Sequence, residues 1–120
     1  MASILIVDDS AFARSSLQII VEGGGHKVIG RASNGEEAVD LFNELKPELV
    51  TLDFLMAGET GDQVLERLLD ITPDARVIMI SGMGDPAIQE KAMAAGAKCF
   101  LPKPFKKGEV LNSIDRVLQP

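Results

Sequence analysis

Five short apolar runs alternate with five segments of helical periodicity, and this alternation constrains the fold more than any other feature of the chain. The apolar runs are residues 3–7, 26–32, 49–53, 75–80 and 97–101. Their length and their content of large and β-branched residues are typical of strands. Strands that alternate with helices form a parallel sheet with helices on both faces. We therefore expect one doubly wound α/β domain over residues 1–120, with five parallel strands and five helices.

Signals at the expected helix starts support this division. Ser10 follows the first apolar run as a candidate N-cap, and Asn34 with Glu37 has the spacing of a capping box. Asp85 before Pro86 combines a capping side chain with proline at the first helical position. The segments between the runs are therefore predicted to be helices with defined starts.

Composition excludes several classes of protein. Hydrophobic residues make up 46% and charged residues 25% of the chain, as in soluble globular domains. The net charge of −6 argues against a surface that binds nucleic acid, and no apolar run has the roughly 20 residues of a membrane span. Cys99 is the single cysteine, so we expect a buried, reduced thiol and a cytoplasmic protein without a secretory signal.

Polar residues follow four of the five predicted strands. Asp8 and Asp9 come after the first, Asp53 ends the third, Ser81 follows the fourth and Lys103 follows the fifth. Carboxyl ends of parallel strands share one edge of the sheet, where open α/β folds place their ligands. Each residue alone could be a helix cap or a turn residue. Together they predict a functional site at that edge.

Three carboxylates at one place require compensation. Two unit charges 4 Å apart repel by about 4 kcal/mol at an effective dielectric constant near 20. Oxygen ligands without histidine or cysteine favour Mg²⁺, whereas Lys103 can hold an additional anion as a point charge. A carboxylate beside a metal, a lysine and a hydroxyl suits phosphoryl transfer, with Asp53 as the nucleophile.

The sequence resembles the receiver domains of two-component response regulators, in particular the single-domain, CheY-like type that includes chemotaxis proteins. The resemblance covers essentially the whole chain. It rests on ILIVDDS at 4–10, NGEEA at 34–38, LVTLD at 49–53, Ser81-Gly82, AGA at 95–97 and KPF at 103–105. It implies the strand order 2-1-3-4-5.

The resemblance also implies a role for each site residue. Asp53 would be the phosphoacceptor, and Mg²⁺ would be held by Asp8, Asp9, Asp53 and the backbone carbonyl of Leu55. The hydroxyl of Ser81 would meet a phosphoryl oxygen. These roles would make the chain a phosphoacceptor switch that assists its own phosphorylation and dephosphorylation, with no separate enzymatic activity.

Two further positions complete the expected switch. Lys103 would precede a cis peptide bond to Pro104, and Phe100 would occupy the switch aromatic position. A histidine kinase would be the phosphodonor. A downstream protein would bind the surface formed by the fourth helix, the fifth strand and the fifth helix.

The chain departs from the family pattern at several positions. Ala57 stands where proline is usual, which predicts a looser loop after Asp53, and Pro102 removes a backbone donor at the end of the last strand. Phe100 lacks the hydroxyl of the tyrosine that is often found there. Leu55 and Met83, which flank the path of the attacking water in this family, are both apolar. We therefore expect slow self-dephosphorylation.

Three alternatives stay open at this point. A small phosphatase with Asp53 as nucleophile would need an acid or base two residues later, where this chain has Leu55. A flavodoxin would place the cofactor phosphate beside acidic Asp8 and Asp9, and the chain has neither tryptophan nor tyrosine for stacking. A receiver that binds metal but is not phosphorylated is a third reading that the residues do not exclude.

Overall fold

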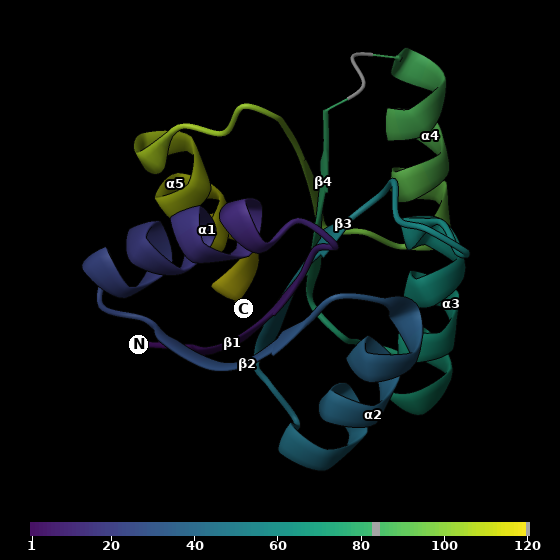
Figure 1. Ribbon diagram of the computed structural model, residues 1–120, viewed down its shortest axis with the longest axis horizontal. Coiled ribbons are helices and arrows are strands. Elements are labelled where there is room, and N and C mark those ends of the chain that lie inside the picture. Colours follow the sequence, from purple (N-terminus) through teal and green to yellow (C-terminus); the bar gives the residue numbers. More distant parts are fainter. Residues whose placement is uncertain (83–84, 120) are drawn as a thin grey trace.

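The computed structural model describes residues 1–82 and 85–119, and there it contains five strands alternating with five helices (Figure 1). The strands are β1 (Ser3–Val7), β2 (Lys27–Ala32), β3 (Leu49–Asp53), β4 (Val77–Ser81) and β5 (Cys99–Pro102). The helices are α1 (Ala11–Gly23), α2 (Gly35–Leu45), α3 (Gly61–Ile71), α4 (Pro86–Ala95) and α5 (Lys107–Leu118). The predicted alternation is confirmed.

The strands form one parallel sheet in the order β2-β1-β3-β4-β5, as the resemblance implied. β2 is an edge strand, and its register against β1 shifts between Ile4 and Leu5, whose partners are Val28 and Gly30. β3 lies in the centre and all five of its residues are buried. Burial on both faces is what its nearly continuous apolar sequence predicts.

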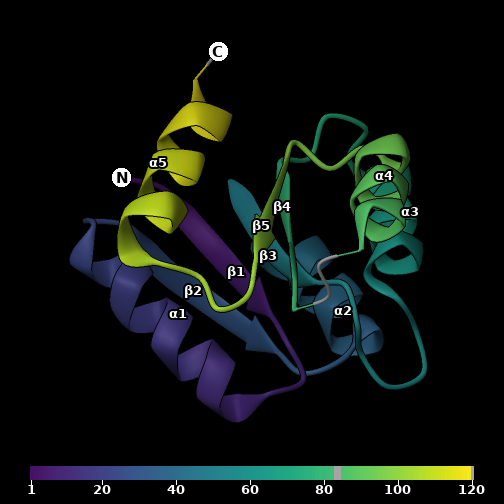
Figure 2. The same cartoon turned by 90° about the horizontal axis from the view of Figure 1, so that it is seen from above.

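Helices cover both faces of the sheet, with α1 and α5 on one side and α2, α3 and α4 on the other (Figures 1 and 2). Successive strand residues point to opposite faces and so contribute to two separate cores. Ile4, Ile6, Ile78 and Ile80 pack with α1 and α5. The second core, on the side of α2, α3 and α4, comprises Leu5, Val7, Val50, Leu52, Val77 and Met79 with residues of those helices.

The predicted helix caps are largely confirmed. The Ser10 hydroxyl accepts from the Ala13 N–H at 3.2 Å, and the Asp85 carboxylate accepts from the Ala87 N–H at 2.9 Å. The predicted capping box at Asn34 is half right, because Glu37 turns its carboxylate to another partner. That carboxylate accepts from the N–H and the hydroxyl of Ser33, at 2.8 and 2.7 Å, instead of from the N–H of Asn34.

Three strands begin later than the apolar runs predict, because the first residues of each run complete the preceding turn. The His26 N–H donates to Val21 at the end of α1, and the Ala97 N–H donates to Ala92 at the end of α4. The Ala75 N–H likewise closes a turn with Thr72. Apolar character alone does not distinguish a residue that buries its side chain in a turn from one in the strand that follows.

Cys99 is a free thiol, as expected, but it is partly buried where full burial was predicted. Its sulfur lies 3.6 Å from the Ser113 hydroxyl and accepts from the Arg116 guanidinium at 3.4 Å. It lies on edge strand β5, where α5 covers it only in part. Within residues 1–82 and 85–119, no helix combines the length and apolar character needed to cross a bilayer.

Candidate functional site

The three predicted acidic residues meet at the carboxyl edge of the sheet. Asp8 follows β1 directly and Asp53 ends β3, and these strands are neighbours in register, with Val7 paired to Leu52. One carboxylate oxygen from each of Asp8, Asp9 and Asp53 lies within 4.8 Å of the others. Asp8 and Asp53 are buried, whereas Asp9 is exposed. The parallel pairing therefore gathers these side chains, as predicted.

Lys103 reaches into this cluster from the end of β5. Its Nζ lies 2.8 Å from Oδ2 of Asp8 and 3.4 Å from Oδ1 of Asp53. The Lys103 N–H donates to the Ser81 carbonyl at 2.8 Å, which fixes its backbone beside β4. The Lys103–Pro104 peptide bond is cis, as the resemblance implied. Pro102 costs the sheet nothing here, because it lies exposed at the end of an edge strand.

Burial and neighbouring charge perturb the pKa of Asp53. Desolvation and the negative charge of Asp8 raise the pKa of Asp53 to about 6, although Lys103 acts in the opposite direction. Burial alone would lower the pKa of Lys103, but its hydrogen bond to Asp8 and the charge of Asp53 outweigh that effect and raise it. Asp53 is therefore ionised at neutral pH, but its charge is poorly compensated by the protein.

Arg14 and the Ser10 backbone hold Asp8 in place, and sequence reasoning missed both contacts. The Ser10 N–H donates to Oδ1 of Asp8 at 2.9 Å, and Nη1 of Arg14 donates to the Asp8 carbonyl at 2.6 Å. Arg14 lies one turn into α1, and a long side chain there can reach back toward the preceding loop. The signal in the sequence for this contact is an arginine six residues after the first of the paired acids.

Ser81 and Phe100 are both on the α4 side of the sheet. Ile80 packs with α1 and α5, so strand alternation directs its neighbour Ser81, which is buried, to the opposite face. Phe100 is half-buried and packs against the core that includes Met79 of β4 and Ala92 of α4. Asp53 pairs with Ile80, so its backbone lies beside the end of β4.

Leu55 lies in the loop after Asp53, with 45% of its surface exposed. A short antiparallel bridge joins Leu55 to Thr60 within this loop. Met83, the other apolar residue predicted to flank the path of the attacking water, lies outside the described residues. Of the predicted site residues, Asp8, Asp9, Asp53 and Lys103 are thus in one cluster, and Ser81 and Leu55 are on the adjoining segments.

The donor set suits a hard divalent cation. All three side-chain ligands are carboxylates close enough to share one ion, and such oxygen ligands are preferred by Mg²⁺. The raised pKa of Asp53 indicates that a further positive charge is needed at this point. The residues present therefore fit a magnesium ion.

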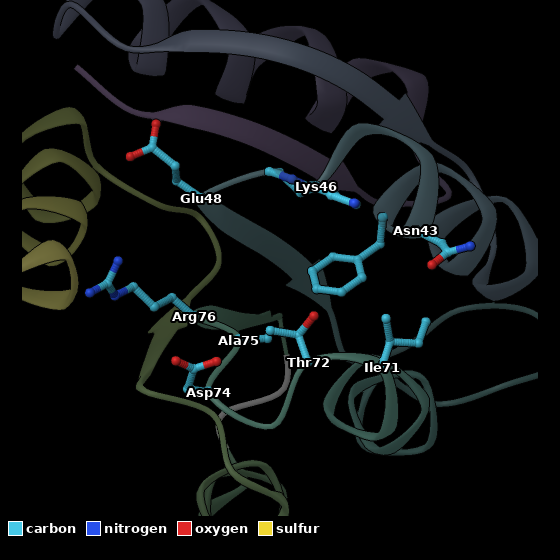
Figure 3. A pocket seen from close by; sticks show the side chains of 10 residues that line it. Asn43, Lys46, Glu48, Ile71, Thr72, Asp74, Ala75 and Arg76 are labelled. Carbon is cyan, nitrogen blue, oxygen red and sulfur yellow. The ribbon is translucent and has the colours of Figure 1, made fainter.

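Another cavity, of about 480 Å³, lies at the opposite edge of the sheet, before β3 and β4 (Figure 3). Its lining includes the basic residues Lys46 and Arg76 and the acidic residues Glu48 and Asp74. The Glu48 carboxylate already accepts from the N–H of Ser3 at 3.0 Å. Such a mixed lining defines no class of ligand, and we assign it no function.

Comparisons with known proteins agree with the geometry. The response regulator receiver domain family matches residues 4–115. The chemotaxis protein CheY of Thermotoga maritima is 41% identical over 114 residues, which is 95% of each chain. CheY of Bacillus subtilis is 41% identical over 115 residues, which is 96% of each chain.

A solved structure shows the same fold in a liganded complex. In the complex of CheX and CheY with BeF₃ and Mg²⁺ from Borrelia burgdorferi, the matching chain superposes with a TM-score of 0.94 at 34% identity. The match covers 98% of this chain and 90% of that one. The Thermotoga and Bacillus relatives named above are chemotaxis proteins. This chain, with its acidic cluster and lysine at the carboxyl edge of a 2-1-3-4-5 sheet, belongs to the response regulator receiver domain family.

Proposed function

We propose that Asp53 accepts a phosphoryl group from the phosphohistidine of a histidine kinase, and that this modification switches the domain between two states. The observation that carries the proposal is the position of Asp53, buried beside two other carboxylates and within 3.4 Å of the Lys103 ammonium. The match to the response regulator receiver domain family and the similarity to CheY proteins support this proposal. We also propose that residues 1–120 act as one cytoplasmic receiver domain.

In the transfer step, a carboxylate oxygen of Asp53 attacks phosphorus, and a phosphorus–oxygen bond forms as the phosphorus–nitrogen bond to imidazole breaks. The electron pair returns to the imidazole nitrogen, which takes a proton from water. Asp53 needs no general base, because a carboxylate with a pKa of about 6 is already ionised at neutral pH. Lys103 is placed to hold a phosphoryl oxygen by its charge.

Asp8, Asp9 and Asp53, with the Leu55 carbonyl, would hold the magnesium ion. When bound, the ion supplies positive charge to the oxygens of the transferring phosphoryl group. The neighbouring residues of the chain orient the carboxylates. Ser10 and Arg14 fix Asp8, so that its carboxylate stays beside Asp53.

Phosphorylation would act on the rest of the domain through Ser81 and Phe100. The phosphoryl group adds negative charge and hydrogen-bond acceptors next to Ser81, whose hydroxyl would move toward it. Phe100 would then fill the space on the α4 side, and the surface of α4, β5 and α5 would change. The downstream target would be a protein that binds this surface. CheX is present in the complex of the Borrelia relative.

Phosphorylation with a small phosphodonor tests the proposal directly. Phosphoramidate and Mg²⁺ should add one phosphoryl group to the wild-type protein, detected as a mass increase that hydroxylamine removes. The Asp53→Asn variant should stay unmodified, and Asp40→Asn, at an exposed acid on α2, serves as the control. Modification of Asp53→Asn would refute the assignment of the phosphoacceptor.

The same experiment separates the remaining alternatives. A phosphorylation-silent receiver would bind Mg²⁺ but would show no mass increase. A phosphatase would release phosphate from the small donor through many turnovers without accumulating the modified form. A switch domain accumulates it, and beryllofluoride with Mg²⁺ should shift the amide resonances of α4 and β5.

A further inference from the structure

The loop between β3 and α3, residues 54–60, carries the Leu55 carbonyl but lacks the proline that usually stiffens it at position 57. Its two ends are nevertheless fastened. The Phe54 N–H donates to the Ile80 carbonyl at 2.8 Å and the Gly61 N–H to the Phe54 carbonyl at 2.6 Å. The bridge between Leu55 and Thr60 closes the loop above this point. Glu59 is the charged side chain within it.

Glu59 is held by an arginine of the following helix. Nη1 of Arg67, on α3, lies 3.0 Å from both carboxylate oxygens of Glu59. Nη2 of the same guanidinium lies 3.4 Å from the Glu36 carboxylate on α2. Glu59 and Arg67 are both partly buried, at 26% and 38% side-chain exposure, so water screens this pair less than a fully exposed one. Arg67 thus ties the loop to two helices.

The position of the Glu59 carboxylate depends on the absence of a side chain at Gly35. Its carboxylate lies against Gly35, the first residue of α2, so closely that a Cβ on residue 35 would overlap Oε1 of Glu59 and crowd Val64. The amino terminus of a helix also favours a negative charge beside it. Position 35 is therefore open on the side from which the Glu59 carboxylate approaches.

We propose that the Glu59–Arg67 pair is the device that positions the β3–α3 loop for magnesium, in place of the missing proline. Neither residue is among the ligands proposed for the ion. Their effect would pass through the loop, because Thr60, the neighbour of Glu59, is bridged to Leu55, whose carbonyl would help to hold the metal in the proposed function. The inference rests on that proposed function and names the two residues of this chain that tune it.

The size of the effect follows from what such a pair is worth. A partly exposed ion pair shifts an equilibrium by about two- to fivefold. Where a loop must be ordered before it can bind, apparent affinity falls with the ordered fraction, at most by the same factor. We expect Arg67→Ala and Glu59→Gln to weaken Mg²⁺ binding by up to about fivefold.

The sign of the Arg67→Ala effect separates positioning from simple electrostatics. Removing a cation from the protein should strengthen Mg²⁺ binding if only long-range charge matters, whereas loss of the pair should weaken it. Mg²⁺ affinity is measured by calorimetry on the full chain. Glu59, Glu66 and Arg67 line one groove on the surface. Glu66→Gln, which neutralises an exposed acid on α3, is therefore the matched control for Glu59→Gln. Gly35→Ala, which displaces Glu59 without changing charge, should weaken binding in the same way.

Amide hydrogen exchange of residues 54–60 gives a readout that does not require metal. Exchange in this loop should be faster in Arg67→Ala and Glu59→Gln than in wild type and in Glu66→Gln. Unchanged exchange, or Mg²⁺ binding that is equal or tighter in Arg67→Ala, would overturn the inference. The proposed function would survive that result. Its own failure shows differently, as a wild-type protein that neither binds Mg²⁺ nor becomes phosphorylated.

Discussion

Replacing Asp53 by asparagine should stabilise the protein when no magnesium is present. The substitution keeps the shape of the side chain and removes a buried negative charge that Asp8 repels. The functional residue is thus predicted to be a source of instability in the metal-free state. This is the opposite of what removing a side chain from the interior ordinarily does.

The magnitude follows from the pKa of Asp53, which is about 6 in the folded protein against an ordinary value of 3.8. At 1.36 kcal/mol for each pKa unit, the difference of 2.2 destabilises the ionised folded protein by about 3 kcal/mol. This figure already includes the opposing effect of Lys103, so we expect Asp53→Asn to raise the free energy of unfolding by up to about 3 kcal/mol.

The pH dependence has a definite sign. A carboxyl whose pKa is raised on folding binds more protons in the folded than in the unfolded state between pH 3.8 and about 6. As the pH rises through this range, the free energy of unfolding of the wild type therefore falls relative to that of the variant. The advantage of Asp53→Asn should be close to zero near pH 4 and complete above about pH 7.

Urea unfolding in EDTA, followed by circular dichroism because the chain has no tryptophan or tyrosine, measures the difference at pH 4.5, 6 and 7.5. Asp9→Asn is the control, because Asp9 is exposed and contributes least to the shift at Asp53. Saturating Mg²⁺ should stabilise the wild type more than the variant and narrow the gap. A variant less stable than wild type at pH 7.5, or a gain independent of pH, would refute the reasoning.

Three other perturbations probe the same site. Because protonation of Asp53 competes with metal, Mg²⁺ affinity measured by calorimetry should fall by close to tenfold for each pH unit below about 6 and level off above 7; a flat profile would contradict this. Lys103→Met leaves Asp8 and Asp53 without their cation, so it should lower the free energy of unfolding by about 3 kcal/mol in EDTA, whereas exposed Lys106→Met should change it little. Changing Leu55 and Met83 together to asparagine should speed loss of the phosphoryl group several-fold in a radiolabel decay assay, and an unchanged half-life would argue against control by apolar side chains.

Much of the fold could be predicted because apolar periodicity and glycine, proline and capping residues all indicated the same segments. The acidic cluster was equally accessible, since parallel pairing alone brings Asp8 and Asp53 to one edge. Contacts that depend on side-chain reach were not. Arg14 lies six residues after Asp8, and Arg67 is eight residues from Glu59, so the path of the chain in space decides whether these pairs form.

Strand starts show where sequence patterns fail. Ala75 and Ala97 are both buried and apolar, but their N–H groups close turns instead of joining the sheet. The Glu37 carboxylate likewise accepts hydrogen bonds from the N–H and the hydroxyl of Ser33 instead of from the N–H of Asn34, because Ser33 offers two donors. Local chemistry allowed both outcomes in each case, and the surrounding backbone decided between them.

The contact between Lys103 and Asp8 spans 95 residues, from the last strand back to the first. On a ribosome, the acids at the end of β1 and β3 therefore emerge long before the cation that balances them. A chain that stops short of position 103 lacks the ammonium group that contacts Asp8 and Asp53. The cluster of Asp8, Asp53 and Lys103 is therefore complete only when the segment after β5 has joined the sheet.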